Sequence, residues 1–387
     1  MSPVYLDNNA STQMGPAVID VMTAAMRQFH ANPSSSEHVA GAAAMQAVEA
    51  AREAIAAGIG ARPPEITFCA GSTEANNLAL LGAFPGLKKL GRPKIITSAI
   101  EHPSVLAPLN WLQSNCGASV VHIPVDESGR VTAETIADEI TDTTGLVSVM
   151  AANNETGIVQ PIEEIAALCA ERGVLFHTDY SQATAYRSLN VQTSKIHMAS
   201  FSGHKMFGPK GIGVLYRRLR KPQVELTPVI HGGGQERGLR SGTLNTPAIV
   251  AIAKAFDLVA RQRSKDCVAI AKRRARLVAG LSAIDGVRTN GDQEHVLPNT
   301  VSFSAEGVES LALMRQLRND VVFSASSACS TDRVEPSHVL VSMFGESPRT
   351  RAAFRLGLGR FTTDQEIELA ITAFTQGIGK LRSGRLG

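Results

Sequence analysis

The chain has 387 residues, of which 44% are hydrophobic and 19% charged, and it carries a formal net charge of +3. This length can bury a large core in two or three domain-sized units, and the composition is that of a folded globular protein rather than a disordered one. The small net charge gives no reason to expect direct binding to nucleic acid or to an acidic membrane.

A polar loop and two helices are expected before the first strand. The loop covers residues 6–12, and apolar residues at helical spacing predict a helix over 16–29. An alanine-rich helix is expected over 39–57, with Gly58 as its stop signal.

Short apolar strands then alternate with helices as far as residue 216. The strands are expected at 66–69, 94–97, 120–124, 146–150, 174–177, 198–201 and 212–216. Helices are expected between them, beginning at Ser72 and Pro103 and covering 133–139 and 162–169. This alternation predicts an α/β fold with a mainly parallel sheet covered on both faces, whose ligands bind at the carboxyl ends of the strands.

The alternation ends near residue 245. A long helical stretch that can break near Ser264 is expected over 247–281, and a shorter α+β segment follows it. That segment has predicted strands at 300–303, 321–323 and 354–356, helices at 309–317 and 338–344, and a capping box at 363–366 that opens the last helix. We therefore expect a large domain over residues 15–258 and a smaller one that combines residues 1–14 with 259–387.

The turn at 202–211 places polar side chains beside an amine. Ser202, His204 and Lys205 follow one predicted strand and precede the next. Two hydrogen-bonding side chains and an amine suit a phosphorylated aldehyde, which needs contacts for its phosphate and a nitrogen for a Schiff base. A lysine in a Gly/Pro-rich turn is also often simply solvated, so the turn alone leaves both interpretations open.

Other residues after predicted strands favour the same kind of ligand. Asp179 follows a buried strand, where it is either a turn residue or the ion-pair partner of a pyridinium nitrogen. Ser72 and Thr73 begin a helix, where they either cap it or bind an anion. His102 could stack on a planar ring or shuttle a proton, and Arg355 could clamp a carboxylate, although each could also be structural.

The five cysteines are scattered without C-x-x-C spacing. This pattern argues against a disulfide framework and against a zinc site, and it favours a reducing compartment. With no signal segment and no apolar run of membrane length, we expect a cytoplasmic protein. Cys329 differs from the others because it lies among small polar residues typical of a mobile, exposed loop, from which a thiolate could attack a bound substrate.

Together these residues resemble the cysteine desulfurases, a group of the fold-type-I, class V aminotransferase-like pyridoxal-phosphate enzymes. The likeness runs from Tyr5 to Thr363 and is carried by the motifs at 153–157, 202–211, 231–243 and 327–330. The segment around Cys329 is similar to the branch that includes the housekeeping iron–sulfur and DNA-phosphorothioation enzymes. The resemblance implies a large sheet domain of the seven-stranded type, joined to a smaller α+β domain.

The resemblance also implies how pyridoxal 5′-phosphate is bound. Lys205 would carry it through a Schiff base, Asp179 would pair with the ring nitrogen, and His102 would stack on the ring. Gln182 would bond the phenolic oxygen, and Asn154 would also contact the cofactor. The phosphate would be held by Ser72, Thr73, Ser202 and His204, with Thr243 supplied by the partner subunit of a homodimer.

The same resemblance implies the reaction. Arg355 and Asn154 would hold the carboxylate of L-cysteine, and Cys329 would attack its sulfur, keep it as a persulfide and release L-alanine. Cys329, Lys205 and His102 would be the catalytic residues, and no metal is expected. A sulfur-acceptor protein would then serve iron–sulfur cluster biogenesis, tRNA thiolation or DNA phosphorothioation.

Some features differ from the family pattern. Tyr180 and Ser181 stand where two alanines are usual, Gln235 replaces a common histidine, and the sequence has no long tail after residue 380, which leaves the acceptor open. A selenocysteine lyase or aminotransferase of the same fold would not need Cys329. A non-catalytic sulfur-relay adaptor is the other alternative, against which Asp179, Gln182, His204 and Lys205 argue.

Overall fold

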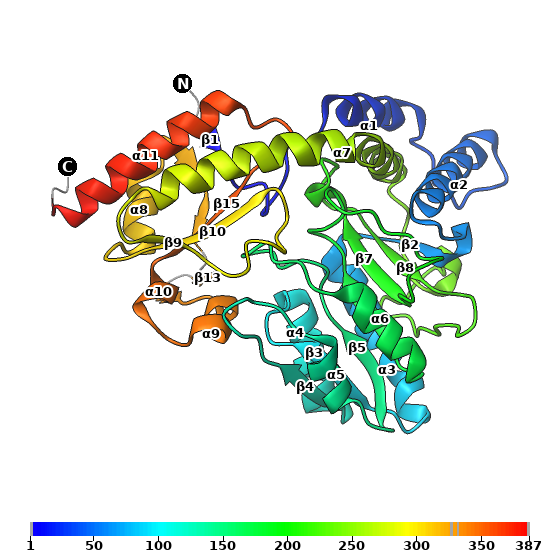
Figure 1. Ribbon diagram of the computed structural model, residues 1–387. Coiled ribbons are helices and arrows are strands. Elements are labelled where there is room, and N and C mark those ends of the chain that lie inside the picture. Colours follow the sequence, from blue (N-terminus) through cyan, green and yellow to red (C-terminus); the bar gives the residue numbers. More distant parts are fainter. Residues whose placement is uncertain (1–2, 326–327, 331–332, 385–387) are drawn as a thin grey trace.

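The structure is a computed structural model that describes residues 3–325, 328–330 and 333–384, without the side chains of 328–330 and 333–335. The two sheets lie near opposite ends of one long helix, and residues 4–5 and 364–382 lie beside the smaller sheet (Figure 1). The described residues form two sheets and two separate strand pairs. The smaller sheet and both pairs contain residues from the last third of the chain, and one of the pairs joins that part to Val4 and Tyr5.

The larger sheet has seven strands in the order β2 (Ile66–Cys69), β8 (Gly213–Arg217), β7 (Met198–Ser202), β6 (Leu175–Asp179), β5 (Thr144–Ser148), β3 (Lys94–Ser98) and β4 (Ser119–Ile123). Strand β8 runs antiparallel to both of its neighbours, and every other neighbouring pair is parallel. Every residue of β5 and β7 is buried, as expected for strands covered on both faces. The predicted fold class is therefore confirmed.

Helices α3 (Ser72–Lys89), α4 (Pro103–Cys116), α5 (Ala133–Glu139) and α6 (Ile162–Glu171) connect these strands, as predicted. Helices α1 (Pro16–Gln28) and α2 (Val39–Ile59) precede the sheet. The predicted stop at Gly58 was wrong, because α2 continues to Ile59 and Gly60 forms the C-cap. Gly60 has a φ of 70°, a left-handed conformation that glycine adopts without a steric penalty.

Helix α7 (Thr246–Ser282) is one uninterrupted helix of 37 residues. The predicted break near Ser264 was wrong. Helix α7 packs against α1, α2 and α11 (Asp364–Arg382), so tertiary contacts support it along its length (Figure 1). The expected boundary between residues 258 and 259 falls inside this helix, and the two-domain division stays a prediction.

The smaller sheet is antiparallel, with strands in the order β12 (Ser324–Ala325), β15 (Ala353–Gly357), β10 (Thr300–Ala305) and β9 (Val287–Thr289). Phe303 stacks on Phe354 within this sheet, and Phe374 of α11 packs edge to face against Phe303. Helices α8 (Ser310–Leu317), α9 (His338–Phe344) and α10 (Pro348–Arg351) complete this part. The parallel pair of β1 (Val4–Tyr5) and β11 (Val321–Val322) attaches the start of the chain to it.

The segment around Cys329 was predicted to be an irregular loop. In the structure, its backbone forms an antiparallel pair between β13 (Ala328–Ser330) and β14 (Arg333–Glu335), in which Cys329 lies opposite Val334. The side chain of Cys329 lies outside the described part of the structure.

Within the described ranges, no helix is both long enough and apolar enough to cross a membrane. The same residues contain no cluster of three or more His, Cys, Asp or Glu side chains that could hold a metal ion.

Candidate active site

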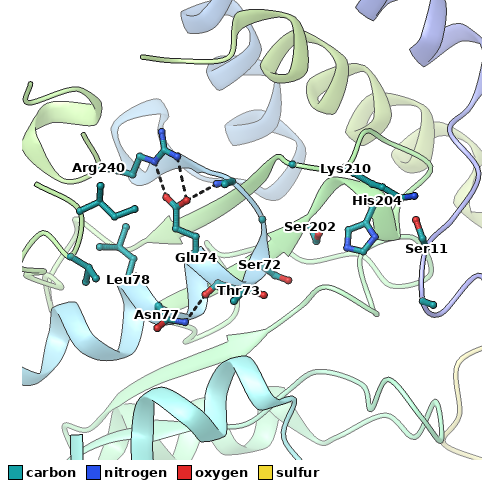
Figure 2. A pocket seen from close by; sticks show the side chains of 16 residues that line it. Ser11, Ser72, Thr73, Glu74, Asn77, Leu78, Ser202, His204, Lys210 and Arg240 are labelled. Atoms are coloured by element: carbon teal, nitrogen blue, oxygen red, sulfur yellow. Dashed lines mark hydrogen bonds and ion pairs between the residues drawn. The ribbon is translucent and has the colours of Figure 1, made fainter. Parts of the chain in front are cut away.

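A cavity of about 770 Å³ opens at the N-terminus of α3. Figure 2 shows the hydroxyls of Ser72, Thr73 and Ser202 and the ring of His204 around it. Gly71, rather than a serine or threonine, is the N-cap of α3, and it offers no side-chain cap. The hydroxyls of Ser72 and Thr73 are therefore free of the capping role and lie beside the exposed N–H groups of the helix start, an arrangement suited to an anion.

The turn before α3 packs closely against Gly213 of β8. A Cβ on Gly213 would come within 2.5 Å of the carbonyl carbon of Gly71. Glycine at position 213 thus lets β8 and the start of α3 approach closely at the edge of the cavity.

Charged side chains at the cavity were not all found from the sequence. Lys210 lines it, as does Arg240, whose guanidinium lies 2.7 Å and 3.2 Å from the two carboxylate oxygens of Glu74 (Figure 2). Arg240 lies 166 positions from Glu74 in the chain. This separation is why no local pattern pointed to the pair.

His204 has an unsatisfied nitrogen at this cavity. Its Nδ1 is buried and has no hydrogen-bond partner among the described residues. Burial, with the neighbouring charges of Lys205 and Lys210, lowers the pKa of His204 to about 4, so the ring is neutral at physiological pH. A neutral ring with an unused nitrogen is available to a ligand in the cavity.

Lys205 ends the short 3-10 turn η2 (Gly203–Lys205), which follows β7 directly. Its amine donates to the backbone carbonyls of Asn9 and, at 3.0 Å, of Ala10. Burial and the charge of Arg355 lower the pKa of Lys205 to about 8, although Asp179 and Asp7 oppose the shift. The amine is therefore unprotonated far more often near neutral pH than an exposed lysine, as condensation with an aldehyde requires.

Asp179 is the last residue of β6 and is buried. Its Oδ2 accepts from Asn76 Nδ2 at 2.8 Å and its Oδ1 from the backbone N–H of Ser181 at 2.9 Å. Both of these donors are neutral. A cationic ring nitrogen is the kind of partner that would compensate a buried carboxylate more fully.

His102 is the N-cap of α4, and its Nδ1 accepts from the backbone N–H of Ser104. A hydrogen-bonded chain through Ser104 and Asn76 connects this ring to Asp179. Neither linking residue was predicted from the sequence. Each lies inside a helix, where serine and asparagine carry no distinctive signal.

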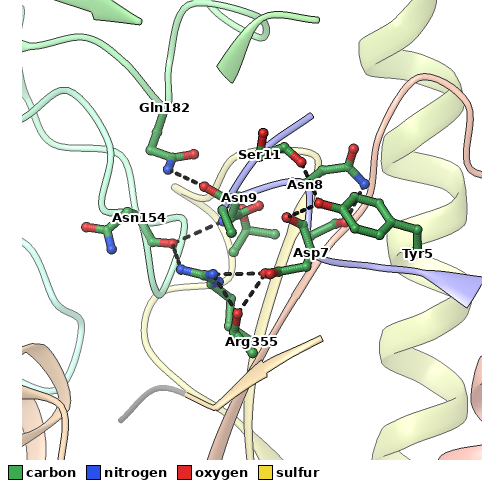
Figure 3. Close-up of polar contacts among 12 residues, drawn as sticks. Tyr5, Asp7, Asn8, Asn9, Ser11, Asn154, Gln182 and Arg355 are labelled. Carbon is green, nitrogen blue, oxygen red and sulfur yellow. Dashed lines mark hydrogen bonds and ion pairs between the residues drawn. The ribbon is translucent and has the colours of Figure 1, made fainter. Parts of the chain in front are cut away.

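The loop at residues 7–12 organises the other side of the site (Figure 3). The carbonyl of Asn9 accepts from Gln182 Nε2 at 3.0 Å as well as from Lys205. From the sequence, this segment was predicted only as a polar loop. The run of consecutive polar residues Asp7, Asn8 and Asn9 was a signal that the sequence offered for this part of the site. In the structure, Asn8 and Asn9 are almost completely buried.

Arg355 reaches this loop from β15. Its Nη2 lies 2.9 Å from Asp7 Oδ1 and 2.9 Å from Ser324 Oγ, and its Nη1 donates to the carbonyl of Asn154 at 3.1 Å (Figure 3). Its Nε is buried and has no partner among the described residues. The structure thus brings Arg355 and Asn154 together, with Asn154 contributing its backbone oxygen to this contact.

The predicted site residue Thr243 has no described contact with the cavity of its own chain. Thr243 is exposed and is not among the residues that line the cavity. Gln235, in the same glycine-rich segment, accepts from the backbone N–H of Gly242 at 2.8 Å and so shapes this loop.

Tyr180 and Ser181 fit beside the site without blocking it. The Tyr180 ring is buried against Phe201, and its hydroxyl donates to the carbonyl of Ser188 at 3.1 Å. The polar end of the larger side chain is therefore satisfied away from Asp179 and Gln182.

Comparison with known proteins defines the class. Residues 4–369 match the aminotransferase class-V family, and the chain belongs to that family. A relative named cysteine desulfurase IscS, from Rickettsia bellii, is 41% identical over 383 residues, which cover 98% of this chain and 92% of the relative. The predicted enzyme class, a pyridoxal-phosphate-dependent cysteine desulfurase, is confirmed.

Solved structures agree with this assignment. A NifS-like protein superposes with a TM-score of 0.90 at 34% identity, covering 99% of this chain and 100% of its own. DndA from Streptomyces lividans superposes with a TM-score of 0.79 at 37% identity, covering 91% of this chain and 99% of its own.

Proposed function

We propose that this chain converts L-cysteine to L-alanine and retains the sulfur as a persulfide on Cys329, from which an acceptor protein takes it. The observation that carries the assignment is the buried amine of Lys205, whose pKa is lowered. Lys205 directly follows His204, which lines the anion cavity at α3, and it is close enough to Asp179 for that carboxylate to affect its pKa. An amine, an anion site and a buried acid are the three groups that a phosphorylated pyridine aldehyde requires.

The residues present fit pyridoxal phosphate. The phosphate would be held in the cavity by Ser72, Thr73, Ser202 and His204. The unpartnered nitrogen of His204 and the N–H groups at the start of α3 can bind an anion there. Asp179 would hold the ring-nitrogen proton, Gln182 and Asn154 would contact the ring substituents, and His102 would lie against the ring. When bound, the cofactor supplies a carbonyl that condenses with amines and a ring that accepts electrons from the substrate carbon.

The amine of Lys205 would move protons in the reaction, and the neutral ring of His102 would assist as a hydrogen-bond donor. Lys205 alternates between neutral and protonated forms near pH 8, so it can take a proton from the substrate and return it. His102 is largely neutral at that pH, because its burial lowers the pKa of the ring.

Arg355 would hold the carboxylate of L-cysteine. Its buried Nε lacks a partner among the described residues, and its other nitrogens contact Asp7, Ser324 and the carbonyl of Asn154. A substrate carboxylate would satisfy the free N–H in the planar geometry that guanidinium favours.

The sulfur step balances without an external oxidant. The thiolate of Cys329 attacks the substrate sulfur, the Cβ–S bond breaks, and Cβ keeps the electron pair and takes up a proton. L-Cysteine and the Cys329 thiol thus give L-alanine and the Cys329 persulfide.

The acceptor and the assembly are further parts of this proposal. The acceptor is a protein thiol of iron–sulfur cluster biogenesis, tRNA thiolation or DNA phosphorothioation, and we expect the enzyme itself not to bind nucleic acid. We propose a cytoplasmic homodimer, in which the exposed Thr243 of each subunit completes the phosphate site of the other.

Measuring alanine and persulfide from L-cysteine tests the function. Cys329→Ala should keep the absorption of the bound cofactor and lose the persulfide, whereas Lys205→Ala should lose the absorption of the lysine-linked cofactor and nearly all alanine formation. Full sulfur transfer by Cys329→Ala would overturn the role of this thiol. A wild-type protein that stays colourless with pyridoxal phosphate would support the relay adaptor, and faster turnover of selenocysteine than cysteine would support the lyase.

Light scattering tests the assembly. A dimer is expected, and mixing Thr243→Ala chains with Lys205→Ala chains should give hybrids in which one site has both defects and the other has neither. A monomer with full activity would contradict the shared phosphate site.

A further inference from the structure

A buried chain of hydrogen bonds joins Asp179 to His102 through two residues of α3 and α4. Asn76 Nδ2 lies 2.8 Å from Asp179 Oδ2 and 2.9 Å from Ser104 Oγ, and Ser104 Oγ lies 2.8 Å from His102 Nδ1. Asn76 is completely buried, and Ser104 is 6% exposed. Water therefore has little access to the two links.

The direction of each hydrogen bond follows from the chemistry of the groups. An ionised carboxylate only accepts, so the amide atom that faces Asp179 is the nitrogen of Asn76. The second hydrogen of this nitrogen points to Ser104 Oγ, which therefore accepts from Asn76. The hydroxyl hydrogen of Ser104 is then left for His102 Nδ1.

The backbone N–H of Ser104 independently identifies His102 Nδ1 as a hydrogen-bond acceptor. The N–H of Ser104 donates to His102 Nδ1 at 3.1 Å, because His102 is the N-cap of α4. A backbone N–H cannot accept, so Nδ1 must present its lone pair. The neutral ring therefore carries its hydrogen on Nε2.

We infer that Asn76 and Ser104 are positioning residues that hold His102 as the Nε2–H tautomer and tie the orientation of its ring to that of Asp179. Nε2–H is then the only donor of the ring, which acts on the reaction through this atom. The inference rests on the proposed function only in assigning His102 and Asp179 to the active site.

The arrangement also opposes protonation of His102, since a second proton would have to enter at Nδ1 and displace both donors. Burial lowers the pKa of His102, the charges of Lys205 in η2 and His338 in α9 lower it further, and Asp179 in β6 opposes them. His338 is held nearby by a contact of 2.9 Å between its Nε2 and the carbonyl of Glu101.

Nitrogen NMR of the ¹⁵N-histidine-labelled holoenzyme tests the tautomer, with His102→Gln used to assign the signal. We expect an unprotonated Nδ1 and a protonated Nε2 in the wild type. In Ser104→Ala and in Asn76→Ala, the pKa of His102 should rise toward its ordinary value of 6.5, because Nδ1 loses its hydroxyl donor or the group that orients it. Ser104→Thr keeps the hydroxyl and should restore the wild-type titration.

The pH profile of kcat/KM for L-cysteine is a second test of the change in the pKa of His102. If the pKa of His102 rises toward 6.5 in these variants, kcat/KM at pH 6 falls relative to its value at pH 8, and the acidic limb of the profile shifts to higher pH. Ser310→Ala and Asn290→Ala are matched controls, since both residues are buried and hydrogen-bonded in the smaller sheet region. They should lower the unfolding temperature without moving this limb.

A wild-type ring that carries its hydrogen on Nδ1 would overturn the inference, as would an unchanged titration of His102 in both variants. Absence of alanine from the wild type would instead contradict the proposed function, and the NMR measurement would still decide the tautomer.

Discussion

Glu101 shows how burial sets the protonation of single residues around this site. The carboxyl is completely buried and accepts from Ser98 Oγ at 2.6 Å and from the backbone N–H of Met150 at 2.9 Å. Its Oε2 has no partner among the described residues. Burial is the main cause that raises the pKa of Glu101 to about 8, and the charge of Asp179 adds to it.

Replacing Glu101 should therefore change how stability depends on pH. The folded-state pKa lies above the ordinary 4.5, so the folded protein binds this proton more tightly than the unfolded chain and loses stability as the pH rises from 4.5 to 8. In Glu101→Gln, this loss, on the order of 1 kcal/mol per pH unit, should disappear. Urea unfolding between pH 5 and pH 8 measures it.

Glu65 is the matched control, since its hydrogen bonds with Arg62 and Leu219 lower the pKa of its carboxyl. Its stabilising effect is present above pH 4.5 and is lost as the pH falls through the lower folded-state pKa. Glu65→Gln should therefore lower stability across pH 5–8 without removing the slope. A slope that persists in Glu101→Gln would show that other groups cause it.

Single residues were predictable from the sequence where a motif surrounds them. Lys205, Asp179 and Ser72 each follow a predicted strand, and parallel strands bring their carboxyl ends to one edge of the sheet. Asn76 and Asn9 were missed, because their roles depend on partners 103 and 196 positions away in the chain. Nothing in the local pattern separates such a buried asparagine from a solvated one.

At the scale of elements, a buried ion pair joins α2, β2 and the glycine-rich segment at 231–243, all in the part of the chain that contains the seven-stranded sheet. Arg52 in α2 donates to both carboxylate oxygens of Glu236 at 2.8 Å and 2.7 Å, and Glu236 also accepts from the backbone N–H of Phe68 in β2 at 2.8 Å. Glu236 lies in the glycine-rich segment that carries Thr243. The pair therefore fixes this loop against α2 and the sheet edge.

Breaking this pair should be costly. The two side chains are 3% and 1% exposed, so Arg52→Leu leaves an uncompensated buried carboxylate and should lower the free energy of unfolding by about 3–5 kcal/mol. The double variant Arg52→Leu/Glu236→Leu should recover much of this loss. Chemical denaturation measures both, and Arg276→Leu, which breaks an exposed pair with Glu368, should cost much less. Equal losses in the Arg52 and Arg276 variants would contradict the importance of burial.

The elements themselves were predicted best where the apolar pattern is regular. Helices α5 and α9 match their predicted bounds, and the strands of the larger sheet begin or end within two residues of prediction. The strands β1, β9, β12, β13 and β14 were missed, because each has only two or three residues and no periodic pattern. Their pairing depends on partners that fold from other parts of the chain.

At the scale of the whole molecule, α7 is the connection between the two sheet regions. Its N-terminal half packs on α1 and α2, and it also packs on α11 (Figure 1). A rigid helix of this kind should make the two regions unfold together, even if they are separate domains.

Ser264 is exposed near the middle of α7, so a substitution there tests this coupling with little direct effect on packing. Ser264→Pro should cost about 3 kcal/mol and separate a single unfolding transition into two. Ser264→Ala should keep one transition. The comparison is made by urea unfolding followed by circular dichroism and cofactor fluorescence, and a single transition in the proline variant would show that other contacts couple the regions.

The loop at residues 7–12 has a consequence for biosynthesis. Asp7 and Asn9 are synthesised well before their partners Lys205, Thr300 and Arg355. The nascent chain must keep this segment unpaired until most of the polypeptide has been made, since these contacts are far apart in sequence. Capture of the cofactor in the completed site therefore has to wait for the synthesis of Arg355, and a holdase that shields residues 7–12 until then would raise the yield of loaded enzyme.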